Sequence, residues 1–238
     1  GDSPMLQTLD LFAGIGGFSL GLERTGGFET VAFCEIEAFP RKVLAKHWPK
    51  VPCYEDVRAL TGAKLAADGI AVDVITGGFP CQPFSAAARG RNNAPDLWPA
   101  MFDAISDIRP RIAILENVKR APIETAARDL RRIGYSVATH PASAADIGAD
   151  HTRSRWWAVA YANNESELHR PLDAEVARMS ELRESVWGWP NYARVFRVPN
   201  GIPDRMDRLK SLGNAVVPQV VELIGYAILE REKELCKQ

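Results

Sequence analysis

The sequence predicts an α/β fold in which a mostly parallel sheet carries helices on both faces. Short apolar runs typical of buried strands alternate with segments whose apolar residues recur at helical spacing. This alternation is typical of a parallel sheet with crossover helices. Hydrophobic residues make up 46% and charged residues 25% of the 238 residues, so the chain has enough apolar material for a sizeable core.

The first elements follow one another with short turns. Thr8–Phe12 is a short apolar run and is expected to form a buried strand. A helix over Gly17–Arg24 is expected to stop at Gly26-Gly27, because glycine takes the left-handed conformation that follows many helices. Val31–Glu35 is expected to be the second strand, and Ala38–Trp48 keeps its apolar side chains on one side of a helix.

The same alternation continues through the middle of the chain. A helix over Pro122–Ile133 is well marked, because proline stands at its start and Gly134 follows its end. Between residues 162 and 203 the alternation fails, and this segment is interpreted as an irregular insert. The other expected elements are strands at Val72–Thr76, Arg111–Leu115, Tyr135–Thr139 and Arg155–Tyr161, and helices at Trp98–Ile108 and Val216–Glu232.

Composition argues against several classes of protein. No apolar run approaches the roughly 18 residues of a membrane-spanning helix, and no signal peptide is visible, so we expect a cytoplasmic protein without a membrane partner. Residues 1–4, before Met5, are interpreted as an expression scar. We expect no metal site and no disulfide framework, because the cysteines form no C-x-x-C pair and the histidines lack metal-ligand spacing.

The charge is uneven along the chain. The formal net charge of −1 alone argues against a protein that coats nucleic acid through bulk charge. Residues 1–80 hold 7 basic and 10 acidic side chains, whereas residues 81–160 hold 11 basic and 8 acidic ones. Arginines gather again in Asn191–Leu212. These patches are either solvated faces or, if a site nearby requires it, a nucleic-acid footprint.

A glycine-rich turn follows the first predicted strand. Asp10–Gly17 reads Asp-Leu-Phe-Ala-Gly-Ile-Gly-Gly, and Glu35 lies 21 residues after Gly14. Glycines let the backbone approach a ligand, and an acid at this spacing suits two ribose hydroxyls. A tight turn without a ligand remains an alternative. A nicotinamide cofactor fits less well, because Ser19 stands where the G-x-G-x-x-G/A pattern requires Gly or Ala.

A cysteine stands in a loop directly after another predicted strand. Gly77–Ser85 reads Gly-Gly-Phe-Pro-Cys-Gln-Pro-Phe-Ser. Flanking glycines and prolines favour presentation of Cys81 to a cleft over burial in a core, and a nucleophilic thiol needs such access. Residues 86–95 are small, polar and basic, which is typical of a mobile lid.

Two further polar groups follow or open strands. Glu116 and Asn117 end the strand after the cysteine loop, so Glu116 is expected to face Cys81, although a helix cap or a surface acid would also fit. Arg153 and Arg155 open a late strand, where alternate residues point to the same face, so both can reach one ligand.

With these motifs in this order, the chain resembles the cytosine-5 DNA methyltransferases. The Asp-Leu-Phe-Ala-Gly-x-Gly-Gly turn, Pro-Cys-Gln, Glu-Asn-Val, Arg-x-Arg and the late run Gly213–Pro218 (Gly-Asn-Ala-Val-Val-Pro) carry the resemblance. It covers about residues 6–161 and 204–228. It implies a Rossmann-like catalytic domain over residues 5–161 and 204–238, with a short target-recognition region at 162–203 between its parts.

The resemblance implies a site for S-adenosyl-L-methionine, which would leave as S-adenosyl-L-homocysteine. Glu35 would hold its ribose and Asp56 its adenine amino group. The implied cofactor-binding residues are Asp10, Phe12, Gly14, Gly16, Gly17, Glu35, Ile36, Asp56, Val57, Gly78, Pro80, Leu97, Asn214, Ala215 and Val216.

The resemblance also implies base flipping and covalent catalysis on double-stranded DNA. Cys81 would be the nucleophile, Glu116 would contact N3 and the exocyclic amine of the target cytosine, and Arg153 and Arg155 would lie near its O2 and the adjacent backbone. The implied DNA contacts are Gln82, Ser85, Arg89, Arg91, Arg194, Arg197, Arg205 and Arg208.

Several departures and alternatives accompany the resemblance. His151 and Asp150 stand where the family often has Gln and Pro, and the recognition region is short. A tRNA-modifying relative with the same chemistry, a non-catalytic DNA-binding relative and a split enzyme are the alternatives. We expect a monomer, with a cognate restriction endonuclease as a candidate partner.

Overall fold

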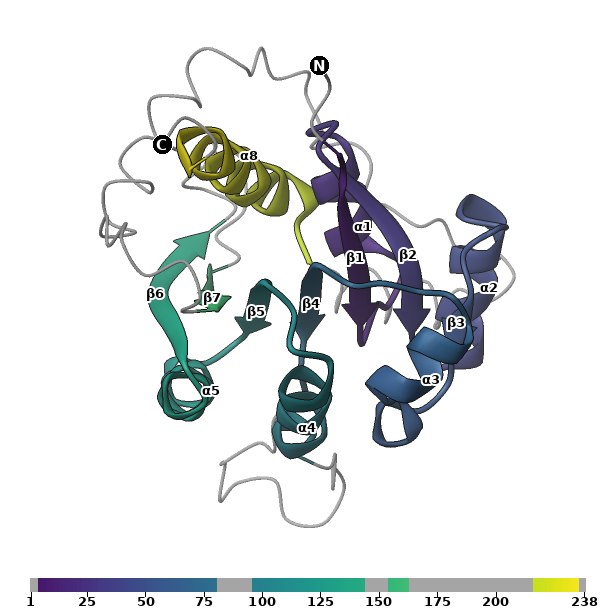
Figure 1. The fold of residues 1–238 in the computed structure, drawn as a ribbon, viewed down its shortest axis with the longest axis horizontal. Coiled ribbons are helices and arrows are strands. Elements are labelled where there is room, and N and C mark those ends of the chain that lie inside the picture. Colours follow the sequence, from purple (N-terminus) through teal and green to yellow (C-terminus); the bar gives the residue numbers. More distant parts are fainter. Residues whose placement is uncertain (1–3, 81–95, 144–153, 163–215, 236–238) are drawn as a thin grey trace, which may run out of the picture.

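A seven-stranded mixed sheet forms the centre of the molecule (Figure 1). The computed structural model describes residues 4–80, 96–143, 154–162 and 216–235. The strands are β1 (Leu6–Leu11), β2 (Phe28–Cys34), β3 (Cys53–Tyr54), β4 (Val74–Gly78), β5 (Ile112–Asn117), β6 (Tyr135–Ser143) and β7 (Ser154–Ala162). The helices are α1 (Gly17–Glu23), α2 (Ala38–His47), α3 (Gly62–Ala67), α4 (Trp98–Ile108), α5 (Arg120–Arg132) and α8 (Pro218–Leu235), with a 3-10 turn at Val57–Ala59.

The strand order is β3-β2-β1-β4-β5-β7-β6, and this order fixes where a ligand can bind. The β1–β2, β1–β4, β2–β3 and β4–β5 pairs are parallel, whereas β7 runs antiparallel to both β5 and β6. The predicted mostly parallel sheet is therefore confirmed. From β1 the chain first extends the sheet towards β3 and then returns to add β4 on the other side, so the switch point lies between β1 and β4. Ligands of such sheets bind beyond the carboxyl ends of the strands at this point.

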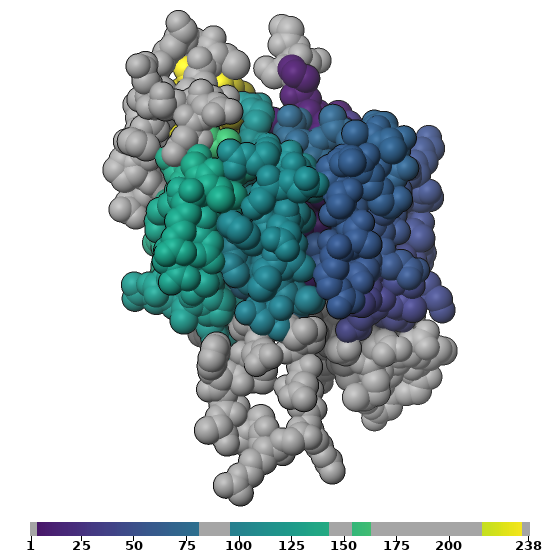
Figure 2. All heavy atoms as spheres, turned by 60° about the horizontal axis from the view of Figure 1, so that its bottom comes forward, coloured from purple at the N-terminus to yellow at the C-terminus, as the bar shows by residue number. Residues whose placement is uncertain are grey.

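Helices cover both faces of the sheet, as the sequence predicts (Figure 1). Helices α1 and α8 pack on one face around a cluster that includes Phe18, Trp157 and Val221. Helices α3, α4 and α5 lie together on the opposite face (Figure 2), where Met101 and Leu130 pack against the strands. The two clusters are separate layers of core, so the sheet is buried on both sides and its central strands carry buried apolar side chains on both faces.

Glycines let α1 and α8 pack very closely. A Cβ added to Gly21 would overlap the carbonyl oxygen of Pro218 and lie 2.7 Å from Cβ of Val221. A Cβ added to Gly17 would lie 2.8 Å from the carbonyl oxygen of Val216, the residue that leads into α8. The lack of a side chain at these two positions therefore lets the start of α8 pack beside the turn that follows β1.

Several elements differ from the sequence-based expectation. Helix α5 begins at Arg120, two residues before Pro122, because proline is tolerated anywhere in the first helical turn. Strand β6 extends to Ser143, since β7 pairs with it along its full length. The short β3 and α3 were not predicted, as they are too brief to show periodicity. Within the described residues, no helix is both long and apolar enough to cross a membrane.

The α1–α8 contact gives a stability prediction. Gly21→Ala should lower the free energy of unfolding by about 1–3 kcal/mol, because the added methyl group has no room against Pro218 and Val221. Gly62→Ala is the matched control, since its Cβ would meet Asp107 at an ordinary 3.4 Å. Urea unfolding of the two variants measures the difference. Equal stability of the Gly21 and Gly62 variants would contradict this packing.

Candidate active site

The turn between β1 and α1 is held in a left-handed conformation. Phe12, Gly14 and Gly16 have φ values of 53°, 54° and 86°. Glycine takes such angles easily, whereas Phe12 is strained by them, and strain of this kind is concentrated at functional sites. A Cβ added to Gly14 would meet no atom within 4 Å, so the space beside this residue is open.

Glu35 joins this turn to the end of β2. Its side chain is 8% exposed, and each carboxylate oxygen accepts one backbone hydrogen bond. Oε2 accepts from the amide of Gly14 and Oε1 from the amide of Glu37, both at 2.8 Å. A carboxylate oxygen has two lone pairs, so one on each oxygen remains for a further donor. This geometry fits two neighbouring hydroxyl groups.

Arg41 fixes the segment that carries Glu35. From α2, its Nη1 donates to the carbonyl oxygens of Glu35 at 3.2 Å and Ile36 at 2.8 Å. Its Nη2 lies 3.1 Å from Oε1 of Glu55. Ile36 itself is 64% exposed, so its side chain provides an apolar surface for a flat ring. Arg41 could not be predicted from the sequence, because an isolated arginine in a helix carries no signal of this contact.

Asp10 lies beneath the turn and does not line the site. It is 0% exposed, Oδ2 accepts from Ser19 Oγ at 3.0 Å, and Oδ1 accepts from Thr76 Oγ1 at 2.8 Å. Burial raises the pKa of Asp10 from 3.8 to about 7, against the opposing effect of these hydrogen bonds. The expectation that Asp10 contacts the cofactor is therefore corrected: it ties β1, α1 and β4 together at the switch point.

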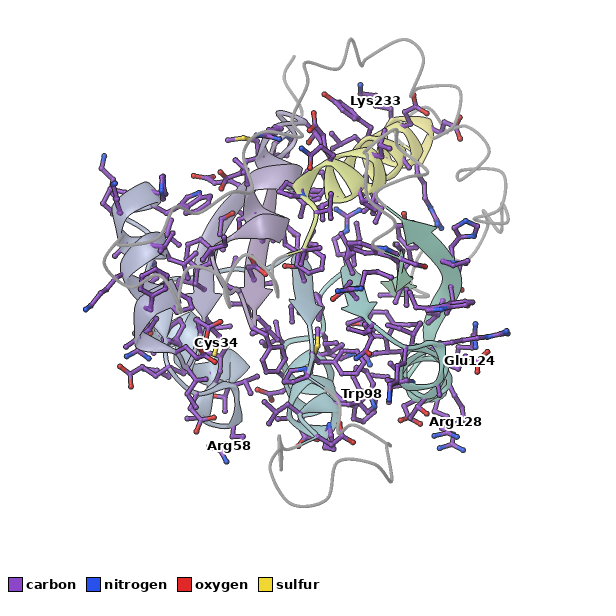
Figure 3. The ribbon with its side chains drawn as sticks, turned by 180° about the vertical axis from the view of Figure 1, so that it is seen from behind. Cys34, Arg58, Trp98, Glu124, Arg128 and Lys233 are labelled. Carbon is purple, nitrogen blue, oxygen red and sulfur yellow. The ribbon has the colours of Figure 1, made fainter. Side chains whose placement is uncertain are left out.

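The next two predicted cofactor residues follow β3. Val57 is buried in the core, while Asp56 is at the surface and pairs with Arg58, with Nη2 and Oδ2 2.7 Å apart. The hydrogen bond from Arg58 lowers the pKa of Asp56. In Figure 3, Arg58 lies at the outer edge of the molecule and Cys34 lies further in. Asp56 thus stays an ionised acceptor on the same side of the switch point as Glu35.

The ends of β4 and β5 are fastened to each other. Asn117 Nδ2 donates to the carbonyl oxygen of Phe79 at 2.9 Å. The backbone amide of Leu97 donates to the carbonyl oxygen of Pro80 at 3.3 Å. A Cβ added to Gly78 would lie 2.9 Å from Oε2 of Glu116, so a side chain there would displace the Glu116 carboxylate. The residue that precedes Cys81 is therefore held next to the end of the strand that carries Glu116.

Glu116 and Arg155 form an ion pair across the sheet. Arg155 Nε lies 2.8 Å from Glu116 Oε1, and both side chains are largely buried. The pair exists because β7 is antiparallel to β5, which brings the start of β7 to the carboxyl end of β5. Two of the four predicted catalytic residues are thus in direct contact. The position of the pair also keeps the Arg155 guanidinium at the same end of the sheet as Glu35.

Some of the other predicted site residues belong to the part of the chain that the structure describes, and the rest lie outside it. Val216 is described and lies beside Gly17 of the turn. Outside the described residues lie Cys81, Arg153, Asn214, Ala215, Gln82, Ser85, Arg89, Arg91, Arg194, Arg197, Arg205 and Arg208, together with residues 163–203 of the predicted recognition region.

The two described cysteines are unsuited to nucleophilic attack. Burial raises the pKa of Cys34 to about 12 and also raises the pKa of Cys53, so both thiols stay protonated near neutral pH. Neither forms a disulfide. Among the residues that the structure describes, no cluster of three His, Cys, Asp or Glu side chains is arranged to hold a metal ion.

Comparison with known proteins identifies the family. The family model described as C-5 cytosine-specific DNA methylase matches residues 6–186. The chain belongs to this family. The match includes the turn, the cysteine loop, Glu116 and Arg155, so the resemblance seen in the sequence is confirmed. The family uses S-adenosyl-L-methionine and acts on DNA.

Type II methyltransferases of two bacteria are similar to this chain along most of its length. The type II methyltransferase M.AplI of Arthrospira platensis is 31% identical over 232 residues, which cover 92% of this chain and 59% of that protein. M.HgiCII of Herpetosiphon aurantiacus is 34% identical over 264 residues, which cover 96% and 58%. The chain spans about half the length of the first such relatives, with 59%, 40% and 42% of them covered.

Solved structures share the fold of this methylase. A putative DNA modification methyltransferase encoded within an E. coli prophage matches with a TM-score of 0.59 and 25% identity, covering 71% of this chain and 49% of that chain. The S. pombe Dnmt2 methyltransferase matches with a TM-score of 0.61 and 21% identity, covering 77% and 56%. The second likeness shows the fold alone.

Asp10 gives a prediction for the pH dependence of stability. Its pKa is higher in the folded state, so its contribution is full below pH 3.8 and is lost as the pH rises to about 7. The free energy of unfolding of the wild type should therefore fall relative to that of Asp10→Asn by up to about 1.4 kcal/mol per pH unit within this window. Denaturant titrations from pH 4 to 8 measure it. Parallel curves for the two proteins would show that Asp10 titrates normally.

Proposed function

We propose that this methylase transfers a methyl group from S-adenosyl-L-methionine to C5 of a flipped-out cytosine in double-stranded DNA, through a covalent bond between Cys81 and C6. The observation that carries the proposal is the Glu116–Arg155 pair, 2.8 Å apart, next to the fastened end of β4 that leads into Cys81. Glu35 and the glycine turn lie at the same end of the sheet, on the other side of the switch point.

The residues present fit S-adenosyl-L-methionine. Glu35 has one free lone pair on each oxygen for the ribose hydroxyls, Gly14 leaves open space beside the turn, and exposed Ile36 can cover a flat adenine ring. Asp56 is the acceptor for an exocyclic amine. When bound, the cofactor supplies a methyl group on a positively charged sulfur. The chain's own residues then bring the cytosine to this methyl group and make C5 nucleophilic.

Cys81 makes C5 nucleophilic. The ring carbon C5 of cytosine is a weak nucleophile, and addition of the thiolate to C6 forms a C–S bond and moves the electron pair of the C5–C6 double bond onto C5. That pair would form the bond to the methyl group as the methyl–sulfur bond breaks, and the sulfur of the leaving S-adenosyl-L-homocysteine would keep the electrons of the broken bond. Loss of the C5 proton to a base and breakage of the C–S bond then restore the double bond and free the thiolate.

Glu116 and Arg155 hold the base during this addition. A Glu116 carboxyl group that shares a proton with N3 stabilises the charge that the ring gains when the thiolate adds. Arg155 keeps this side chain in place and offers further N–H donors to the cytosine O2. A base in a duplex is stacked and out of reach, so it must be flipped out at a cost of about a few kcal/mol.

The chain is organised as one catalytic domain with a recognition region inserted into it. Residues 5–161 and 204–238 form the catalytic domain, and residues 162–203 form the target-recognition region. Arg153 assists Arg155, residues 214–216 contact the cofactor, and the arginines and polar residues named in the sequence analysis contact DNA. The protein acts as a monomer in the cytoplasm, with a restriction endonuclease as its functional partner.

A covalent trap tests the nucleophile. Duplex DNA that carries 5-fluorocytosine at the target should form an adduct with the wild type, because fluorine cannot leave as a proton does and the C–S bond persists. Cys81→Ala should give no adduct, whereas Cys53→Ala should react as the wild type does. Intact-protein mass spectrometry measures the mass of the adduct, and peptide mapping locates it. An adduct on the Cys81→Ala protein would overturn the assignment.

The substrate class is tested separately with the same protein. Label from methyl-labelled S-adenosyl-L-methionine should enter duplex DNA as 5-methylcytosine, with at least tenfold less entering tRNA. Transfer mainly to tRNA would support the RNA-modifying alternative and overturn the DNA substrate. The absence of label from both, with the cofactor still bound, would support a non-catalytic protein.

A further inference from the structure

Trp48 lies directly against the glycine turn. A Cβ added to Gly16 would lie 2.7 Å from Cζ3 and 2.8 Å from Cη2 of the Trp48 ring. The backbone of the turn therefore rests on the six-membered part of the indole. Trp48 follows α2 in the sequence, so a residue 32 positions further along the chain supports the turn. No motif in the sequence indicates this contact.

The turn needs such a support. Gly16 is the N-cap residue of α1, with φ 86°, and no side chain caps the helix. Helix α1 is only seven residues long and has no acidic residue in its first turn. Short helices are weakly stable on their own, so packing must hold this one and the left-handed residues before it. Trp48 supplies an aromatic surface at the residue where the turn becomes helix.

Glu23 fixes the orientation of the indole. Trp48 Nε1 lies 2.9 Å from Oε2 and 3.1 Å from Oε1 of Glu23, the last residue of α1. Glu23 Oε1 also accepts from the amide of Thr30 in β2, at 3.2 Å. Hydrogen bonds to a charged acceptor are among the strong ones. One carboxylate thus joins the end of α1, a strand and the ring that supports the start of α1.

Trp48 also reaches the strand that carries Glu35. Its ring makes an edge-to-face contact with Phe33, with centroids 5.4 Å apart and planes at 67°. Phe33 lies in β2, two residues before Glu35. The indole therefore contacts both segments that the Gly14–Glu35 hydrogen bond joins: the turn at Gly16 and β2 at Phe33.

We propose that the Trp48–Glu23 pair is a positioning device for the cofactor site, which sets the glycine turn at the correct distance from Glu35 without touching the cofactor. The proposal rests on the proposed function, because it takes S-adenosyl-L-methionine as the ligand. It assigns a role in cofactor affinity to two residues outside the predicted site. Loss of the pair should weaken binding of the cofactor and leave the chemical step, at Cys81 and Glu116, unchanged.

The test compares two substitutions that each replace a larger aromatic residue by phenylalanine and remove a hydrogen bond. Trp48→Phe keeps an aromatic ring but removes both the N–H that binds Glu23 and the outer ring atoms on which Gly16 rests. Tyr135→Phe is the matched control, since it also removes one buried hydrogen bond, from Tyr135 Oη to the carbonyl oxygen of Pro110 at 2.7 Å, near the amino end of β5. Isothermal titration calorimetry with S-adenosyl-L-homocysteine measures affinity, thermal unfolding measures stability, and steady-state methyl transfer separates KM from kcat.

Trp48→Phe should bind the ligand about fivefold to tenfold more weakly and raise the KM for the cofactor alike, with kcat within about twofold of the wild type. Tyr135→Phe should lose thermal stability with unchanged affinity. Glu23→Ala should behave as Trp48→Phe does, and Glu23→Gln, which keeps an acceptor oxygen, should recover most of the affinity.

The outcomes separate this inference from the proposed function. Failure of the wild type to bind S-adenosyl-L-homocysteine would overturn the proposed cofactor. Normal wild-type binding with equal affinity in Trp48→Phe would overturn the positioning role alone, as would an equal loss of affinity in Tyr135→Phe. If Glu23→Ala does not fold, Trp48→Phe and Glu23→Gln still decide, because the first keeps an aromatic ring at position 48 and the second keeps the size of the Glu23 side chain.

Discussion

The position of the Glu35 carboxylate is the constraint on which the rest of the site depends. Its two backbone hydrogen bonds, each 2.8 Å long, join the turn after β1 to the start of α2. A carboxylate that is 8% exposed is stable only if its oxygens are satisfied, so the turn must present the amide of Gly14 inward. The left-handed backbone of the turn follows from this requirement. Two residues support the same arrangement. Arg41 in α2 binds the carbonyl oxygen of Glu35, and Trp48, directly after α2, packs against Gly16 of the turn.

On the other side of the switch point, the antiparallel direction of β7 fixes the position of a second functional side chain, Arg155. If β7 ran parallel to β5, its first residues would lie at the far end of the sheet, and Arg155 could not reach Glu116. Buried ion pairs add little net stability, because desolvation offsets most of their attraction. The Glu116–Arg155 pair is therefore better explained by its proposed role, which is to position both side chains for the target cytosine, than by a contribution to stability. Asn117 and Gly78 add to the same end, by tying β4 to β5 and by leaving room for the Glu116 side chain.

Sequence reasoning found the parts that depend on neighbours along the chain. The glycine turn, Glu35 and Glu116 were predicted because each lies at a strand end that local apolar runs reveal. The contacts of Arg41, Trp48 and Glu23 could not be predicted, since they join residues through the fold and leave no periodic pattern. Asp10 was assigned to the cofactor because it belongs to the motif, but its burial depends on Ser19 and Thr76, which only the assembled sheet brings to it. The direction of β7 was likewise hidden, because a strand pattern does not show which way a strand runs.

The most direct measurement of the central claim compares two ligands in two proteins. S-adenosyl-L-homocysteine and its 2′,3′-dideoxy analogue are titrated into the wild type and into Glu35→Gln. If Glu35 holds the ribose, the substitution should weaken binding of the natural ligand at least about tenfold more than binding of the analogue, because hydrogen bonds to a charged acceptor are worth about 1.5–3 kcal/mol. An equal loss for both ligands would contradict the account, since it would show that Glu35 shapes the turn without touching the ribose.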